Sequence, residues 1–123
     1  MAVKNNPVSL APGCPIKLTN NGQITASGQS LQFTVPKRPD GGEFSLVLQI
    51  VGAPVGLTSQ LQADFSSGGL GSNLQNYGGA GPTAAGNFVI GTANSAPIVA
   101  GALYSLNITA LTSGSFDVFA VIN

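Results

Sequence analysis

The acidic side chains are the residues of this chain best suited to chemistry, and there are four of them: Asp40, Glu43, Asp64 and Asp117. Two carboxylates placed on either side of a glycosidic bond can cleave it by acid–base or nucleophilic catalysis. Asp64 and Asp117, however, fall on the polar side of alternating segments, where a single solvated acid needs no catalytic explanation. We therefore expect no catalytic residue.

Metal and cofactor chemistry is poorly represented as well. The chain contains no His and a single Cys, Cys14, which excludes imidazole ligands, a His-activated nucleophile and a disulfide within the chain. Asp40 and Glu43 could offer oxygens to Ca²⁺, but Ca²⁺ takes about six to eight ligands, so a solvated loop is the better interpretation. The Gly-rich residues 78–86 lack the Lys and the following helix of a phosphate-binding loop. We expect no metal, no cofactor and no enzymatic activity.

Charge is scarce and balanced. Charged residues make up 7% of the 123 residues, with four basic against four acidic side chains and a formal net charge of +0; about 25% is typical. This balance argues against nucleic acid and anionic lipid as partners. No run approaches the roughly 20 apolar residues of a membrane span, and the first residues lack the apolar stretch of a secretory signal. We expect a soluble domain made without export, or a mature chain given a new Met.

The elements that position these residues are indicated by alternation of apolar and polar side chains with a period of two. Such alternation predicts antiparallel strands with one solvated face. It is clearest in residues 31–35, 57–65 and 104–110. Turn-forming residues separate these runs: Asn20-Asn21-Gly22 predicts a tight turn, and Thr112-Ser113-Gly114 predicts a hairpin between the last two strands. No window favours a helix.

Seven or eight short strands with regular turns indicate an all-β protein, a single antiparallel β-sandwich with the jelly roll as one candidate topology. Residues 16–123 form that domain. Residues 1–15 carry three prolines, which permit an extended N-terminal arm but no helix and no central strand. Val3, Val8 and Leu10 would let the arm bury itself, either along the sheet edge of a neighbouring chain or on its own domain.

Two of the expected strands, residues 44–51 and 116–122, carry apolar residues on both faces. Val47 and Val51, and likewise Phe119 and Val121, occupy the face that should be polar in a half-solvated strand. Such a strand is either covered on both sides within its own domain or lies at a contact with another chain.

Two loop features and the loop residue Leu70 complete the candidates. Lys37, Arg38, Asp40 and Glu43 hold half of all the charges; they could form a specific polar contact, or protect an adjacent strand from edge-to-edge pairing. Tyr77 could stack on a sugar ring or anchor its loop by packing. The expected interface combines these loop residues with Leu70 and with apolar residues of the arm and of the two strands that are apolar on both faces. It comprises Val3, Val8, Leu10, Lys37, Arg38, Asp40, Glu43, Val47, Leu70, Tyr77, Phe119 and Val121.

The C-terminal third, from Tyr104 to Asn123, resembles the closing hairpin of small β-sandwich virion proteins of tailed bacteriophages. There, a strand that ends in a Thr-Ala-Leu-like corner is followed by Ser-Gly and a last alternating strand. Residues 45–52 and 59–66 are similar to the preceding strands, so the resemblance covers residues 43–123. Relatives often carry Ser-x-Asp-Gly and a following Trp where this chain has Ala63-Asp64-Phe65-Ser66 and no Trp.

The resemblance implies a non-enzymatic structural protein of the virion, with a capsid decoration (cement) protein that binds and stabilises the capsid surface as the leading expectation. Its partners would be the major capsid protein or other virion subunits, and it would form a homo-oligomer, a trimer in preference to a dimer. Neither nucleic acid nor membrane is expected as a partner. The alternative is a carbohydrate-binding β-sandwich module or a receptor-binding appendage domain.

Overall fold

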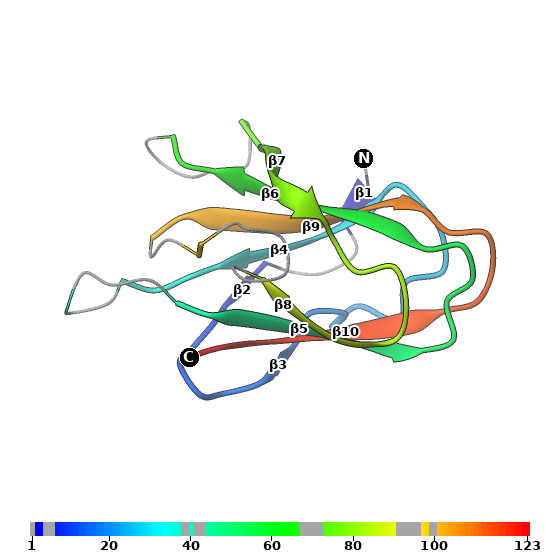
Figure 1. Ribbon diagram of the computed structural model, residues 1–123, viewed down its shortest axis with the longest axis horizontal. Coiled ribbons are helices and arrows are strands. Elements are labelled where there is room, and N and C mark those ends of the chain that lie inside the picture. The colour runs from blue at the N-terminus through cyan, green and yellow to red at the C-terminus, as the bar shows by residue number, and fades with distance from the viewer. Residues whose placement is uncertain are drawn as a thin grey trace.

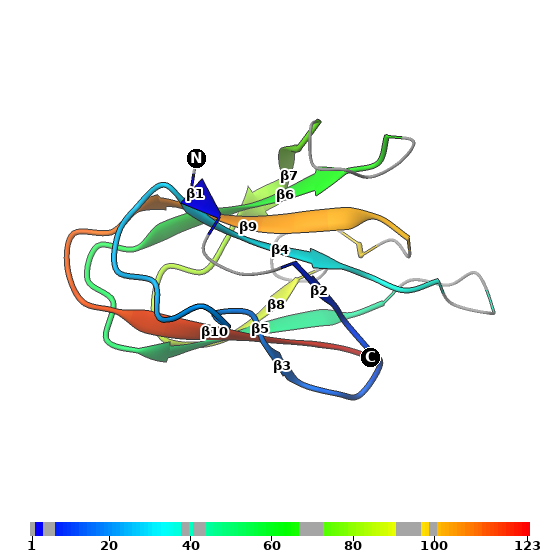
Figure 2. The same ribbon diagram turned by 180° about the vertical axis from the view of Figure 1, so that it is seen from behind.

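The computed structural model describes residues 2–3, 7–37, 40, 44–66, 73–90, 97–98 and 101–123, and over these residues the chain forms strands and no helix (Figure 1). The strands are β1 (Ala2–Val3), β2 (Val8–Ser9), β3 (Ile16–Lys17), β4 (Gln29–Thr34), β5 (Leu46–Gly52), β6 (Thr58–Asp64), β7 (Gln75–Ala80), β8 (Gly86–Ile90), β9 (Leu103–Ala110) and β10 (Phe116–Ile122). They form two sheets, ordered β1-β4-β9-β6-β7, with β2 also on β4, and β3-β10-β5-β8. The two sheets face each other, as both views show (Figures 1 and 2), which confirms the expected all-β sandwich.

The strands from β3 to β10 pair in a nested order, in which the first pairs with the last, the second with the last but one, and so on inward. β3 pairs with β10, β4 with β9, β5 with β8 and β6 with β7, all of them antiparallel. Two further ladders, β5–β10 and β6–β9, join these pairs into the two sheets. This connectivity is that of a jelly roll, the topology that the sequence left as one candidate.

The core lies between the inner faces of the two sheets. Burial alternates along β10, where Phe116, Val118, Ala120 and Ile122 are buried and the residues between them are half-buried. The ring of Phe33 on β4 stacks on Tyr104 of β9 at 5.8 Å between centroids, so the two central strands of the first sheet share an aromatic layer.

The N-terminal arm lies along its own domain, one of the two positions that the sequence left open. β1 and β2 both pair in parallel with β4. Beyond β2, the Leu10 N–H donates to the Thr34 carbonyl at 2.9 Å, and the Gly13 N–H donates to the Ile122 carbonyl at 2.8 Å. Leu10 is 3% exposed, so its side chain belongs to the core and not to the surface where an interface was expected.

The turn Thr112-Ser113-Gly114 does not close a hairpin, and this prediction was wrong. It carries the chain from β9 in the first sheet to β10 in the second. The turn rests on the connection between β5 and β6, because the Val55 N–H donates to the Ser113 carbonyl at 2.9 Å and the Thr112 N–H donates to the Val55 carbonyl at 2.9 Å. Two crossovers between the sheets therefore lie side by side at this end of the sandwich (Figure 1).

The outer face of β9 is less solvated than its alternation predicts. Ser105 is 0% and Asn107 is 8% exposed. β9 is a central strand, and its register places Ser105 between Gln32 of β4 and Gln62 of β6. Long amide side chains therefore flank Ser105 on both sides, whereas Asn107 lies between Ser30 of β4 and Gln60 of β6.

Candidate functional site

The outer face of the second sheet carries a continuous apolar row. Register aligns Val121 of β10 with Val47 of β5, and Val47 with Val89 of β8. Phe119 lies two residues before Val121 on the same face of β10, and all four side chains are half-buried. We call Val47, Val89, Phe119 and Val121 the apolar strip. A groove of about 240 Å³ runs over three of them and is bordered by Pro15.

A polar network borders the apolar strip on β10. The Thr19 hydroxyl donates to Asp117 Oδ1 at 2.8 Å, and the Gln23 amide donates to Asp117 Oδ2 at 3.2 Å. The Lys17 ammonium lies 3.6 Å from Asp117 Oδ1. The hydrogen bond from Thr19, together with those from Gln23 and Lys17 and the charge of Lys17, lowers the pKa of Asp117 below its ordinary value, against the opposing effect of burial. Asp117 thus joins β10 to the segment that follows β3.

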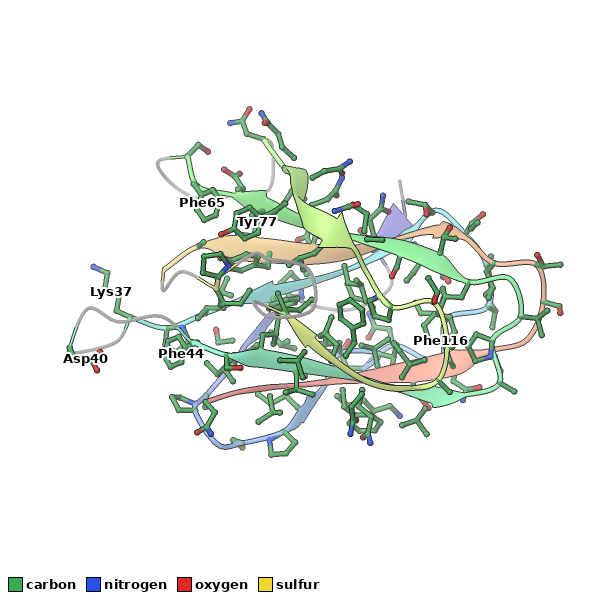
Figure 3. All side chains as sticks on the ribbon, in the orientation of Figure 1. Lys37, Asp40, Phe44, Phe65, Tyr77 and Phe116 are labelled. Atoms are coloured by element: carbon green, nitrogen blue, oxygen red, sulfur yellow. The ribbon has the colours of Figure 1, made fainter. Side chains whose placement is uncertain are left out.

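A second surface feature, a hollow of about 360 Å³, lies where β6 ends and β7 begins. Its described lining comprises Ala63, Asp64, Phe65, Ser66, Asn73, Gln75, Asn76 and Tyr77. We call it the aromatic hollow, because Phe65 and Tyr77 meet there with their rings 5.2 Å apart and inclined at 72° (Figure 3). Phe65 is 54% exposed. The Tyr77 hydroxyl donates to the Pro97 carbonyl at 2.6 Å, which fixes the orientation of the phenol.

Asp64 connects two lining residues of the aromatic hollow, Ser66 and Asn73, by hydrogen bonds. It is 1% exposed, so the expectation of a solvated acid was wrong. Its Oδ1 accepts hydrogen bonds from the backbone N–H and the hydroxyl of Ser66, and its Oδ2 accepts one from the Asn73 N–H at 3.4 Å. The strand ends at Asp64, and its carboxylate binds the backbone of the residues that follow.

The two best-placed acids do not form a catalytic pair. Asp64 ends β6 in the first sheet, whereas Asp117 lies on β10 in the second. Their neighbours Phe65 and Phe116 lie at opposite ends of the sandwich (Figure 3). Glycosidase carboxylates lie within about 10 Å of each other, so this arrangement does not suit glycoside cleavage between them.

The remaining expected interface residues are dispersed. Val8 is half-buried against the core, and Lys37 and Asp40 are exposed at one end of the sandwich (Figure 3). The backbone of Val3 pairs with Ser30 of β4. Three expected residues lie outside the described residues: Arg38, Glu43 and Leu70.

The described residues offer neither a metal site nor a membrane-spanning helix. They contain no group of three or more His, Cys, Asp or Glu side chains that could hold a metal ion. Within the same part of the chain, no helix has the length and apolar character that crossing a bilayer requires.

Sequence reasoning brought together Val47, Phe119 and Val121, but it missed Val89 and Phe65. Val89 follows Phe88 in a short strand, and only the pairing of β8 with β5 shows which of the two faces outward. Phe65 continues the alternation of Leu61 and Ala63, which predicted an inward position. The alternation stops one residue earlier, at the end of β6.

Comparison with known proteins identifies no family. No protein-family profile matches the chain, and no curated protein matches it. Among solved structures, the chain is similar to the pre-peptidase C-terminal domain of a collagenase from Bacillus anthracis, at 14% identity and a TM-score of 0.41, over 97% of this chain and 96% of that one.

Proposed function

We propose that the chain is a non-enzymatic structural protein of a virus particle, a capsid decoration protein that binds and stabilises the capsid surface through its apolar strip. The observation that carries the proposal is the strip itself, in which Val47, Val89 and Val121 align across three strands on the outer face of the second sheet. Buried apolar area is the main driving force for association, and a solvated sheet face has no need of such a row.

The neutrality of the chain supports a protein that works in an assembly. A formal net charge of +0 gives little electrostatic repulsion between copies, and net charge is what helps a free domain to stay monomeric. A subunit that is held in a symmetric lattice does not depend on that repulsion. In this function the chain acts as a clamp, a homo-oligomer and a trimer in preference to a dimer, that contacts adjacent major capsid subunits and opposes their separation.

The test is reconstitution on particles assembled without the protein. Such particles should lose resistance to heat or pressure and regain it when the purified protein is added. Phe119→Ser and Val47→Ser should weaken binding about tenfold or more in co-sedimentation, because each removes an apolar contact worth roughly 1.5–3 kcal/mol when buried.

Val55→Ser is the matched control, because Val55 is 54% exposed but lies outside the strip, in the connection between β5 and β6. It should bind like the original protein. The proposal fails if the protein does not co-sediment with the particles, or if the strip variants bind as well as Val55→Ser does.

A further inference from the structure

We propose that the aromatic hollow binds a neutral carbohydrate, with the exposed ring of Phe65 packing against the apolar face of a pyranose ring. This binding site is additional to the capsid contact and does not depend on it. The hollow belongs to β6 and β7 of the first sheet, whereas the apolar strip lies on the outer face of the second sheet (Figure 1).

The ring of Phe65 is held in place before any ligand arrives. It contacts Tyr77 at 5.2 Å and 72°, and Tyr104 at 6.1 Å and 90°, both edge to face. Tyr104 is 0% exposed and stacks in turn on Phe33, so the support of the ring reaches into the core. A ligand that stacks on a fixed ring loses little side-chain entropy on binding, which favours affinity. The 54% exposure of Phe65 leaves apolar area for such a contact.

Amide groups surround the ring. Asn73, Gln75 and Asn76 are exposed and line the same hollow. Each carboxamide offers both a donor and an acceptor, which suits hydroxyl groups that also donate and accept. The volume of about 360 Å³ is at the lower end of small-molecule sites, which range over about 300–1,000 Å³. An apolar platform with amides along its lining thus matches a sugar, which has C–H faces and a hydroxyl rim.

The charges of the hollow indicate a neutral sugar. The described lining has one ionisable acid, Asp64, and no Lys or Arg. Asp64 is buried, and its oxygens accept hydrogen bonds from Ser66 and Asn73, so they are already engaged within the chain. A buried carboxylate with no cation in the described lining disfavours phosphorylated and sialylated glycans, because like charges repel at short range.

The polar surface continues beyond the hollow. Asn76 of β7 accepts a hydrogen bond from the Gln62 amide at 3.3 Å, and Gln62 aligns with Ser105 of β9, which aligns with Gln32 of β4. Ser105 Oγ is buried and has no hydrogen-bond partner among the described residues. Because Ser105 is covered, the exposed amide of Asn76 is the part of this row that also lines the hollow.

The experiment is an array of neutral oligosaccharides with glucose, mannose, galactose or N-acetylglucosamine ends, with sialylated and phosphorylated glycans as the anionic arm. The best neutral glycan is then titrated by calorimetry. We expect sub-millimolar affinity, about a tenfold or greater loss in Phe65→Ala, and retained binding in Phe65→Trp, which keeps a stacking ring. Val55→Ala, which truncates another side chain that is 54% exposed, should bind normally.

The fold of each variant is checked by thermal melting. If Phe65→Ala does not fold, Asn76→Ala takes its place, because this exposed amide can be removed without opening the core. The proposal is overturned by the absence of any neutral glycan among the ligands, by a preference for the anionic arm, or by binding that survives loss of the Phe65 ring. None of these results alters capsid binding, which is measured with the apolar-strip variants.

Discussion

Replacing Gly114 by Ala tests whether the chain crosses between the two sheets at this turn. The replacement should lower the free energy of unfolding far more than the same change at another glycine with a positive φ. The φ angle of Gly114 is +86°, and a Cβ built there would lie 2.1 Å from the Ala53 carbonyl oxygen and 3.1 Å from its carbon. Both are backbone atoms, which cannot rotate away. Gly28 is the matched control: its φ is +80°, and a Cβ there would meet nothing within 4 Å.

The magnitudes follow from these two environments. A positive φ costs an L-residue about 1–2 kcal/mol, and the smaller entropy of an unfolded chain with Ala offsets about 0.4–1 kcal/mol of it. Gly28→Ala should therefore destabilise by about 1 kcal/mol. Gly114→Ala adds the overlap with Ala53, about 1–3 kcal/mol for overpacking of a close contact. The free energy of unfolding should fall by about 2–4 kcal/mol.

The assay is urea denaturation and thermal melting of both variants beside the original protein. For a domain of this size each kcal/mol lowers Tm by roughly 3–5 °C, so Gly28→Ala should melt about 4 °C lower and Gly114→Ala about 8 °C or more lower. Equal Tm values for the two variants would refute the reasoning. They would show that Gly114 does not approach Ala53, as would be the case if β9 and β10 formed a hairpin within one sheet.

Two further predictions concern the acids. Because the pKa of Asp117 is lowered in the folded state, the stabilising effect of its carboxylate is present above its ordinary pKa of about 4 and is lost as the pH falls through the lower, folded pKa. The Asp117→Asn variant should therefore lose less stability than the original protein between pH 5 and pH 2, as measured by urea titrations. Parallel stability curves for the two proteins would contradict this. The Asp64→Ala variant leaves the Ser66 and Asn73 donors without their acceptor. It should therefore lower the free energy of unfolding by about 2–4 kcal/mol and weaken glycan binding. An unchanged Tm would show that the carboxylate does not organise the hollow.

The strands were predictable because alternation is a local property. Leu31 and Phe33, or Leu106 and Ile108, share a face whatever their strands pair with, and the structure places them in the core. What alternation does not contain is the identity of the partner strand. Thr112-Ser113-Gly114 reverses the chain equally well in a hairpin and in a crossover, and only the contacts with Val55 and Ala53, more than fifty residues earlier, select the crossover.

The candidate site was less predictable, because exposure depends on neighbours that are distant in sequence. Ser105 was expected to be solvated and is buried, since the amides of Gln32 and Gln62 flank it from both sides. Phe65 was expected to be buried and is exposed, since its strand ends at Asp64. The alternation of a single strand contains neither the point where the strand ends nor the side chains of the strands beside it.

The scarcity of charge has a consequence for both proposed surfaces. Asp64 and Asp117 are each committed to hydrogen bonds that join segments of their own chain: Asp64 joins Ser66 to Asn73, and Asp117 joins Thr19 to β10. These carboxylates stabilise the fold at the points where strands end, and they add little charge to the outer faces. Recognition on those faces must then come from apolar area and neutral hydrogen bonds. The apolar strip supplies the first and the aromatic hollow supplies both, which is why we propose a neutral subunit surface for the one and a neutral glycan for the other.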